Sequence, residues 1–292
     1  MISARQNTAF STNNTLTLRG QLVTLSSPLV MGILNITPDS FYAGSRHASL
    51  PEIIKKATSM VQDGAHILDI GGYSTRPGAD DIPQELESQR ILPVIQAIRK
   101  VIPEVYISVD TFRSAVARQA VEAGADIVND VSGGELDPLM FQTVADLHVP
   151  YICMHMRGTP QTMTSLSGYE NLLYEIINYF HKKVDRLHQS GVKDIIIDPG
   201  FGFAKTIEQS FELLRHLDHM RIIGKPILVG LSRKSMIWKT LNISADEALN
   251  GTTALNMAAL QQGASIVRVH DVREAVQTVK LFGKLAFPAA GV

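Results

Sequence analysis

The sequence has little cysteine and little net charge, and it lacks any long hydrophobic run. Cys153 is the one cysteine among 292 residues, which excludes an internal disulfide and a cysteine-based metal site. Lys and Arg total 27 against 28 for Asp and Glu, so we expect neither nucleic acid nor a membrane as a partner. No stretch of about 18 apolar residues is present, which argues against a transmembrane helix.

Residues 1–14 lack the basic start and apolar stretch of a signal peptide, and we expect a disordered polar tail there. The chain is 45% hydrophobic and 19% charged, which is enough apolar side chain for a substantial core. No linker or change of composition interrupts the rest, so we expect one domain over residues 15–288. A single cysteine suits a reducing compartment, and we expect a cytoplasmic protein.

A short phrase recurs four times, at 63–70, 123–130, 190–198 and 262–269. In each copy a helix-like stretch leads to a glycine, where a helix end needs a residue with positive φ. An apolar, β-branched run follows and predicts a buried strand. Similar runs without the glycine lie at 29–35, 106–110, 150–154 and 227–230, which makes eight predicted strands.

Segments of helical character alternate with these strands, at 50–61, 84–101, 113–122, 138–147, 169–188, 207–217, 246–261 and 272–285. Alternating strands and helices predict a parallel sheet. Eight such units in about 250 residues fit a closed (β/α)8 barrel, the TIM barrel. A doubly wound open sheet is the alternative. Residues 15–25 alternate apolar and polar and predict a short N-terminal β-hairpin across the bottom of the barrel.

Nearly all the predicted strands end in polar residues, and in a (β/α)8 barrel the C-terminal strand ends carry the chemistry. An Asp after a strand is often only a helix cap, and mutual salt bridges, such as Asp198 with Lys234, are a second structural explanation. A whole ring favours a ligand site, because burying each polar group costs free energy. The strand-end residues are Asn35, Asp69, Asp110, Asn129, Asp130, His155, Asp198, Ser232, Arg233, Lys234, Ser235, Arg268 and His270.

The ring divides into two kinds of chemistry. Asp110, Asn129 and Asp198 offer carboxylate and amide groups that suit a flat heterocycle with N–H donors. Arg268 and His270 offer positive charge that suits phosphate, and arginine also stacks on planar rings.

Two loops rich in Gly and Pro, 36–44 and 71–79, directly follow strands. Such loops can close over a site and exclude water. Arg76, in the second loop, would add a further positive charge for phosphate.

At this point the motifs, taken in order, resemble those of the dihydropteroate synthase family, over about residues 16–285. The chain departs from the motifs typical of the family at three places, which are Tyr73, the pair Tyr42 and Ala43, and Ser210. The matching motifs are MGILNITPDSF at 31–41, DIGGYSTRPGA at 69–79, SVDT at 108–111, NDVSG at 129–133, MHMRG at 154–158, DPGFGF at 198–203, GLSRKS at 230–235 and RVHDV at 268–272.

The resemblance implies a folate-biosynthesis transferase. It would join p-aminobenzoate to 6-hydroxymethyl-7,8-dihydropterin pyrophosphate, giving 7,8-dihydropteroate and pyrophosphate. Pyrophosphate would leave first, and the amine would then attack. The family further implies Mg²⁺ as cofactor, a homodimer through helices late in the chain, and sensitivity to sulfonamides that mimic p-aminobenzoate.

The resemblance also assigns roles to individual residues, with Asp110, Lys234 and Arg268 as the catalytic group. Asn35 would contact Mg²⁺. The implied ligand contacts are Asp110, Asn129, Asp198, Lys234 and Arg268 for the pterin, Arg76, Arg268 and His270 for pyrophosphate, and Phe41, Thr75, Pro77, Phe203 and Ser235 for p-aminobenzoate.

Three other functions remain open from the residues. A pterin-binding methyltransferase would share the carboxylates but needs no pyrophosphate site, and the motifs around Lys234 and Arg268 argue against it. A Schiff-base aldolase would use Lys234 as nucleophile. A non-catalytic pterin-binding module would need inert loops.

Overall fold

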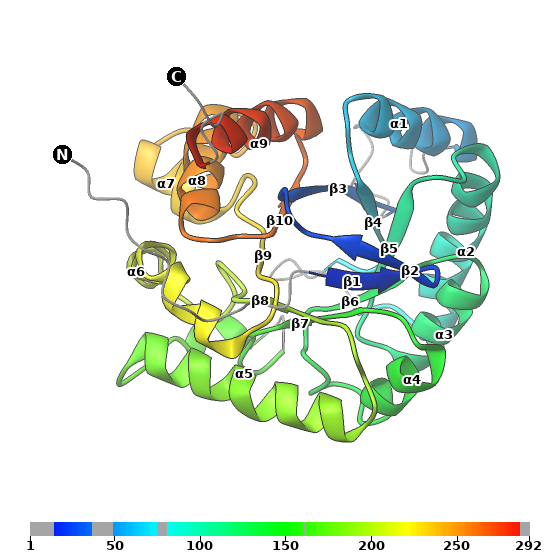
Figure 1. Cartoon of the computed structure of the whole chain (residues 1–292), viewed down its shortest axis with the longest axis horizontal. Helices are drawn as coiled ribbons and strands as arrows, with labels where there is room; N and C mark the ends of the chain where they lie inside the picture. Colours follow the sequence, from blue (N-terminus) through cyan, green and yellow to red (C-terminus); the bar gives the residue numbers. More distant parts are fainter. Residues whose placement is uncertain (1–14, 37–48, 75–80, 160–161, 287–292) are drawn as a thin grey trace.

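A computed structural model describes residues 15–36, 49–74, 81–159 and 162–286. Its centre is a ring of parallel strands surrounded by helices (Figure 1). The strands of the ring are β3 (Leu29–Asn35), β4 (Ile67–Gly71), β5 (Tyr106–Asp110), β6 (Ile127–Asp130), β7 (Tyr151–Met154), β8 (Ile195–Asp198), β9 (Leu228–Val229) and β10 (Ile266–Val269).

The sheet closes on itself, so the predicted barrel is confirmed and the open-sheet alternative is wrong. Strands pair in the order β8-β7-β6-β5-β4-β3-β10-β9. A parallel bridge between Ile197 and Ile227 then joins β8 to β9. Strand β9 is shorter than the predicted 227–230, because its pairing with β10 covers only Leu228 and Val229.

The helices lie outside the ring and follow the predicted segments closely. Between β9 and α8 (Leu249–Gln261) the chain forms the additional short helix α7 (Ser235–Leu241). After α6 (Ile207–Arg215) it continues as the 3-10 helix η3 (Leu217–Ile223). A second 3-10 segment is η2 (Met163–Ser165). The α-helices are α1 (Leu50–Gln62), α2 (Gln84–Val101), α3 (Ser114–Glu122), α4 (Met140–Leu147), α5 (Leu172–Gln189), α6 (Ile207–Arg215), α7 (Ser235–Leu241), α8 (Leu249–Gln261) and α9 (Val272–Ala286).

The glycine of each recurring phrase stands where a helix turns into a strand. Gly64, Gly124, Gly191 and Gly263 all have positive φ, between 94° and 117°. A residue without a Cβ atom adopts this conformation without strain and satisfies the last helical carbonyls. The repeat therefore marks the point at which each of these helices stops.

The predicted hairpin consists of β1 (Thr15–Leu18) and β2 (Gln21–Thr24), an antiparallel pair. It lies across the ring of strands (Figure 1). Leu16 and Leu18 are 1% exposed and share one apolar cluster with Met31, Ile67 and Ile266, near the start of their strands. The hairpin thus closes the bottom of the barrel, and a ligand must approach from the opposite end.

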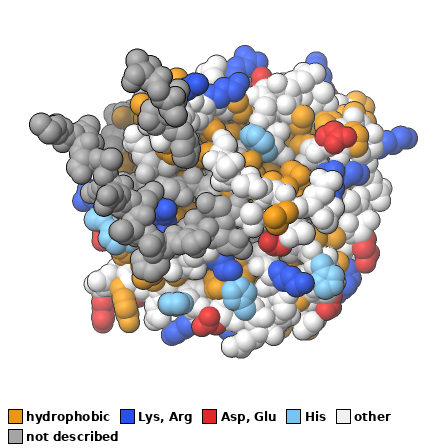
Figure 2. All heavy atoms as spheres, in the orientation of Figure 1, with side chains coloured by type: hydrophobic (Ala, Val, Ile, Leu, Met, Phe, Trp, Pro, Cys, Tyr) orange, Lys and Arg blue, Asp and Glu red, His pale blue; other side chains and the backbone are white. Residues whose placement is uncertain are grey.

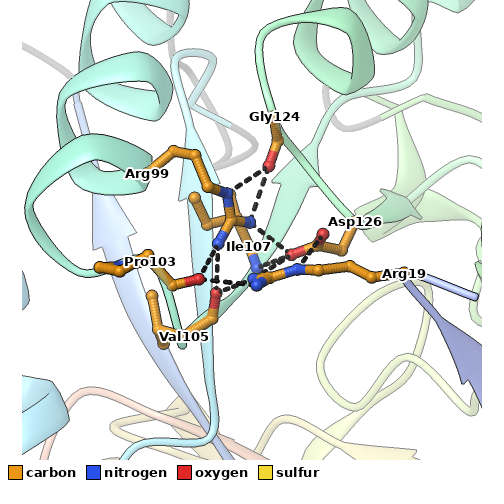
Figure 3. A network of polar contacts seen from close by, with 7 residues as sticks. All are labelled: Arg19, Arg99, Pro103, Val105, Ile107, Gly124 and Asp126. Carbon is orange, nitrogen blue, oxygen red and sulfur yellow. Dashed lines mark hydrogen bonds and ion pairs between the residues drawn. The ribbon is translucent and has the colours of Figure 1, made fainter. Parts of the chain in front are cut away.

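Arg19, in the hairpin turn, also ties the hairpin to the barrel through ionic contacts (Figure 3). Its Nε lies 2.9 Å from Oδ1 of the buried Asp126, and Arg99 Nη2 lies 2.6 Å from Oδ2 of the same carboxylate. The backbone N–H of Ile107 donates to Asp126 as well, at 2.8 Å. One buried carboxylate therefore joins the hairpin, α2 and the start of β5 and β6.

Candidate functional site

The alternation of side chains along the strands builds a polar layer above the apolar cluster that the hairpin covers at the bottom of the barrel. Residues two apart on a strand point to the same side of the sheet. Ile67, Ile127, Ile196 and Ile266 all lie in the apolar cluster with the hairpin, so they face the barrel interior. The residues two positions later also face inward, nearer the open end, and they are Asp69, Asn129, Asp198 and Arg268.

Arg268 is the centre of this layer. Its Nε lies 2.6 Å from Oδ2 of Asp69, and its Nη2 lies 2.7 Å from Oδ2 of Asp110. Asn129 Nδ2 donates to the same Asp69 oxygen, at 3.1 Å. Burial alone would lower the pKa of the Arg268 guanidinium, but Asp69 and Asp110 together raise it above its usual value. Arg268 is therefore a fixed, permanently charged group.

The second carboxylate partner, Asp110, is more exposed to the site. Its side chain is 14% exposed, whereas that of Asp69 is fully buried. Burial raises the pKa of Asp110 to about 7, although the positive charge of Arg268 acts in the opposite direction and lowers this pKa. A ligand that brings positive charge to Asp110 would favour the ionised form.

Across the ring, Asp198, Lys234 and Phe203 form a second cluster, in which Lys234 interacts with the Asp198 carboxylate through its charge and with the Phe203 ring by direct contact. The Lys234 Nζ lies 4.3 Å from the centre of the Phe203 ring, which is within the range of a cation–π contact. Burial lowers the pKa of Lys234 to about 8, although Asp198 raises it. Burial raises the pKa of Asp198, opposed by the N–H of Gly200, which donates to Oδ1 at 2.8 Å. Among the described residues, the ion pairs of the ring run from Arg268 to Asp69 and to Asp110, and the Asp198–Lys234 salt bridge of the structural alternative is not formed.

His270 requires a correction. The sequence suggested a positive charge there, but burial beside Arg268 lowers the pKa of His270 to about 3, so the ring is neutral. Its Nδ1 lies 2.9 Å from Ser232 Oγ, which also accepts the His270 backbone N–H at 3.2 Å. If the Ser232 hydroxyl donates to Nδ1, the imidazole keeps an Nε2–H donor for an anion. His270 can therefore bind phosphate as a neutral donor.

The remaining predicted site residues divide by position. Asn35 ends β3 and is half-buried, and Ser235 is the first residue of α7 and also half-buried. Other predicted contacts fall outside the described residues, namely Phe41, Thr75, Arg76 and Pro77, as do most of the two predicted loops.

Three polar strand-end residues face away from the ring and support the structure. Asp130 accepts the Tyr151 hydroxyl at 2.7 Å and two backbone N–H groups of its own loop. Arg233 turns to Asp271, with Nη2 to Oδ1 at 2.8 Å. His155 is 2% exposed and packs edge-on against Tyr179. The contacts of these three side chains hold strand ends and loops in place.

Asp69 is a site residue that the sequence reasoning missed as a functional group. The signal was available, because Asp69 stands two residues after the inward-facing Ile67, as Arg268 stands two after Ile266. Its other oxygen, Oδ1, is buried without a hydrogen-bond partner. Such a carboxylate requires a reason for its burial, and holding Arg268 and Asn129 provides one.

The described residues contain no group of three or more His, Cys, Asp or Glu side chains arranged to hold a metal ion. In the same part of the chain, no helix has the length and hydropathy needed to cross a membrane. On the hairpin face of the molecule, Figure 2 shows basic and acidic side chains scattered among neutral and hydrophobic ones.

Comparison with known proteins gives one consistent result. A family model described as pterin binding enzyme matches residues 31–270. The chain is 49% identical over 255 residues to the dihydropteroate synthase of Synechocystis sp., covering 86% of this chain and 88% of that protein.

Solved structures agree with the sequence comparison. The Yersinia pestis dihydropteroate synthase with a sulfonamide drug is similar at a TM-score of 0.88 and 38% identity, over 93% of this chain and 99% of that one. The Xanthomonas albilineans dihydropteroate synthase with 4-aminobenzoic acid is similar at 0.87 and 36% identity, over 94% and 98%.

Proposed function

The chain belongs to the dihydropteroate synthases, within the pterin-binding enzymes, and we infer that it carries out their reaction at the ring around Arg268. The reaction is a transferase step of folate biosynthesis. It joins p-aminobenzoate to 6-hydroxymethyl-7,8-dihydropterin pyrophosphate and yields 7,8-dihydropteroate and pyrophosphate. The observation that carries this assignment is the guanidinium of Arg268, held between Asp69 and Asp110 and facing the open end of the barrel.

The pterin end of the site consists of acceptors on rigid strand ends. The Asp198 carboxylate would accept hydrogen bonds from the N–H groups of the pterin edge, and the Asn129 side-chain amide could both accept from that edge and donate to it. Lys234 would donate to the same edge, and the planar Arg268 would stack on the ring face. Because Asp198, Asn129 and Arg268 stand on strands, the pterin pocket would be formed before the second substrate binds.

Pyrophosphate loss creates the electrophile. The C–O bond breaks, and its electron pair leaves with pyrophosphate, whose charge Arg268, His270 and Arg76 would stabilise. The cation that remains is delocalised over the dihydropterin ring. Its positive charge would favour the ionised form of Asp110, and the Asp110 carboxylate would in turn stabilise the cation. Holding both charges in place before the reaction is what lowers the barrier.

p-Aminobenzoate then forms the new bond with its own lone pair. Its arylamine is neutral at pH 7, so the nitrogen attacks without a general base, forms the C–N bond and releases a proton to solvent. Phe203 and Ser235, with the predicted contacts Phe41, Thr75 and Pro77, would form its pocket.

Mg²⁺ fits this site as an ion held mainly by substrate. Among the described residues no cluster of acidic side chains offers a dedicated metal cage, and Mg²⁺ is often held by one or two protein oxygens plus phosphates. The Asn35 side-chain oxygen would be the protein ligand. When bound, the ion would neutralise the leaving pyrophosphate.

We also propose a homodimer and sulfonamide inhibition. Leu241 on α7 and Leu281 and Leu285 on α9 are 52%, 63% and 67% exposed, which supports an interface on the late helices. Sedimentation equilibrium tests the dimer.

Sulfonamides would compete with p-aminobenzoate for the pocket beside Phe203. The cytoplasmic location of the protein stays a prediction.

The direct test is turnover. The protein, Mg²⁺, the pterin pyrophosphate and p-aminobenzoate should yield dihydropteroate and pyrophosphate, with no product when either substrate is omitted. Reduction with borohydride and a carbonyl substrate should leave Lys234 unmodified, since a trapped lysine would indicate the aldolase. Pterin binding without turnover would indicate the binding module.

A further inference from the structure

One lysine holds the loop that joins β8 to α6, residues 199–206. The Nζ of Lys205 lies 3.0 Å from the carbonyl oxygen of Gly200 and 3.0 Å from that of Phe203. The same Nζ lies 3.0 Å from Nδ1 of His155, which follows β7. An ammonium group has three N–H donors, so these three acceptors use all of them.

His155 is a fixed attachment point for the lysine. Its ring packs edge-on against Tyr179, with ring centres 4.8 Å apart, and its backbone N–H donates to the Asp198 carbonyl at 2.9 Å. Burial lowers the pKa of His155 well below its usual value, with help from the nearby Lys205 charge. The neutral imidazole can therefore present an unprotonated Nδ1 as an acceptor for Lys205.

The first anchored carbonyl belongs to a residue that also fixes the Asp198 carboxylate. Gly200 donates its N–H to Asp198 Oδ1 at 2.8 Å. The backbone passes so close to β7 that a Cβ atom on Gly200 would lie 2.2 Å from the His155 carbonyl oxygen. Movement of Gly200 would therefore move the carboxylate assigned to the pterin edge.

The second anchored carbonyl belongs to Phe203, whose ring lies under the Lys234 ammonium. Between Phe203 and Lys205, Ala204 has a φ of +48°, and its carbonyl accepts the Tyr169 hydroxyl at 2.9 Å. Non-glycine residues rarely adopt positive φ, so the loop needs anchors on both sides of Ala204 to keep this shape.

We propose that Lys205 is a positioning residue for both substrates. It fastens the β8–α6 loop to the end of β7, and so holds the Asp198 carboxylate for the pterin edge and the Phe203 ring for the p-aminobenzoate pocket. This inference depends on the proposed function, because that function assigns the two substrates to Asp198 and Phe203.

The test replaces the ammonium with a chain of similar length. Lys205→Met should raise the KM of each substrate about ten-fold, equivalent to about 1.4 kcal/mol. The kcat should fall less, by about threefold, because Arg268 and Asp110 stand on other strands and make no contact with Lys205. Kinetics are measured at pH 6, since burial lowers the pKa of Lys205 to about 7 and the ammonium form has the three donors.

Two further variants keep the result interpretable. Lys225→Met removes another lysine–histidine contact, to His188 at 2.9 Å on the surface, and should leave both KM values unchanged. Lys205→Gln keeps two N–H donors and should restore part of the lost affinity. It also replaces Lys205→Met if the latter does not fold.

The outcomes separate the two proposals. If Lys205→Met has a lower melting temperature but both KM values within twofold of wild type, Lys205 is structural only and the inference is wrong. If the wild type has no turnover, or Asp198→Ala keeps full pterin affinity, the proposed function itself fails.

Discussion

The Nε of Arg268 lies 2.6 Å from Oδ2 of Asp69, although 199 positions separate the two residues. This contact joins β10 to β4 across the ring of strands. The Nη2 of Arg268 donates to Oδ2 of Asp110, at 2.7 Å. Arg268 is thus oriented before any substrate arrives.

Asp69→Asn should reduce both stability and turnover. Removing one partner of a buried ion pair costs about 3–5 kcal/mol, and the lower end applies here because Arg268 retains Asp110. Urea unfolding and kcat measure the two effects. The control is Asp63→Asn, which loses a more exposed pair with Arg273 that is worth about 0–1 kcal/mol. Equal effects of the two substitutions would show that Asp69 does not orient Arg268.

Asp198→Ala should weaken pterin binding. The variant removes the acceptor proposed for the N–H groups of the ring, and a lost hydrogen bond to a charged group costs about 1.5–3 kcal/mol. Calorimetry with the pterin, in the absence of p-aminobenzoate, measures the change. Asp194→Ala, just before the start of β8, is the matched control. Unchanged affinity in Asp198→Ala would contradict the assignment of the pterin edge.

His270→Ala and Arg268→Ala should weaken binding of pyrophosphate more than binding of a pterin that lacks it. Both side chains are assigned to the anion, and Arg268 has the larger expected effect because it is charged whereas His270 is neutral. Competition binding with inorganic pyrophosphate measures each loss. An equal loss for both ligands in the Arg268 variant would mean that the guanidinium acts mainly by stacking.

His270 should also make the stability of the protein depend on pH. Burial lowers its pKa to about 3 in the folded protein, against about 6.5 when unfolded. Between these values the unfolded chain binds more protons, so this contribution is complete above pH 6.5 and is lost as the pH falls.

Between pH 7.5 and pH 5 the wild type should therefore lose about 2 kcal/mol more free energy of unfolding than His270→Gln. Urea unfolding at both pH values measures the difference. His181→Gln, on the exposed face of α5, should follow the wild type. Parallel curves for wild type and His270→Gln would show that His270 titrates normally.

Arg19→Ala should destabilise the fold without altering the site. The variant removes two hydrogen bonds to Asp126 and one to each of two backbone carbonyls, those of Pro103 and Val105 (Figure 3). A bond to a charged group contributes about 1.5–3 kcal/mol. The melting temperature should fall while both KM values stay constant, since the hairpin lies at the opposite end of the barrel. A changed KM would mean that the hairpin influences the substrate pockets.

The sequence alone determined the order and kind of the elements. Strand and helix alternate because apolar periodicity is local, and Gly64, Gly124, Gly191 and Gly263 mark helix ends by a conformational need that acts within a few residues. The polar strand ends can also be found from the sequence, because they directly follow the predicted apolar strands. The family could therefore be identified before any contact was known, because its motifs are short and lie at those ends.

Only the tertiary structure decided which polar residues meet and in what state of charge. Arg233 and Lys234 are neighbours in the chain, but one turns to Asp271 and the other to Phe203. The neutrality of His270, the role of Asp69 and the three contacts of Lys205 depend on burial and on partners from other strands. These properties arise from groups brought together by closure of the barrel, and pKa values and ion pairs depend on such distances rather than on position in the chain.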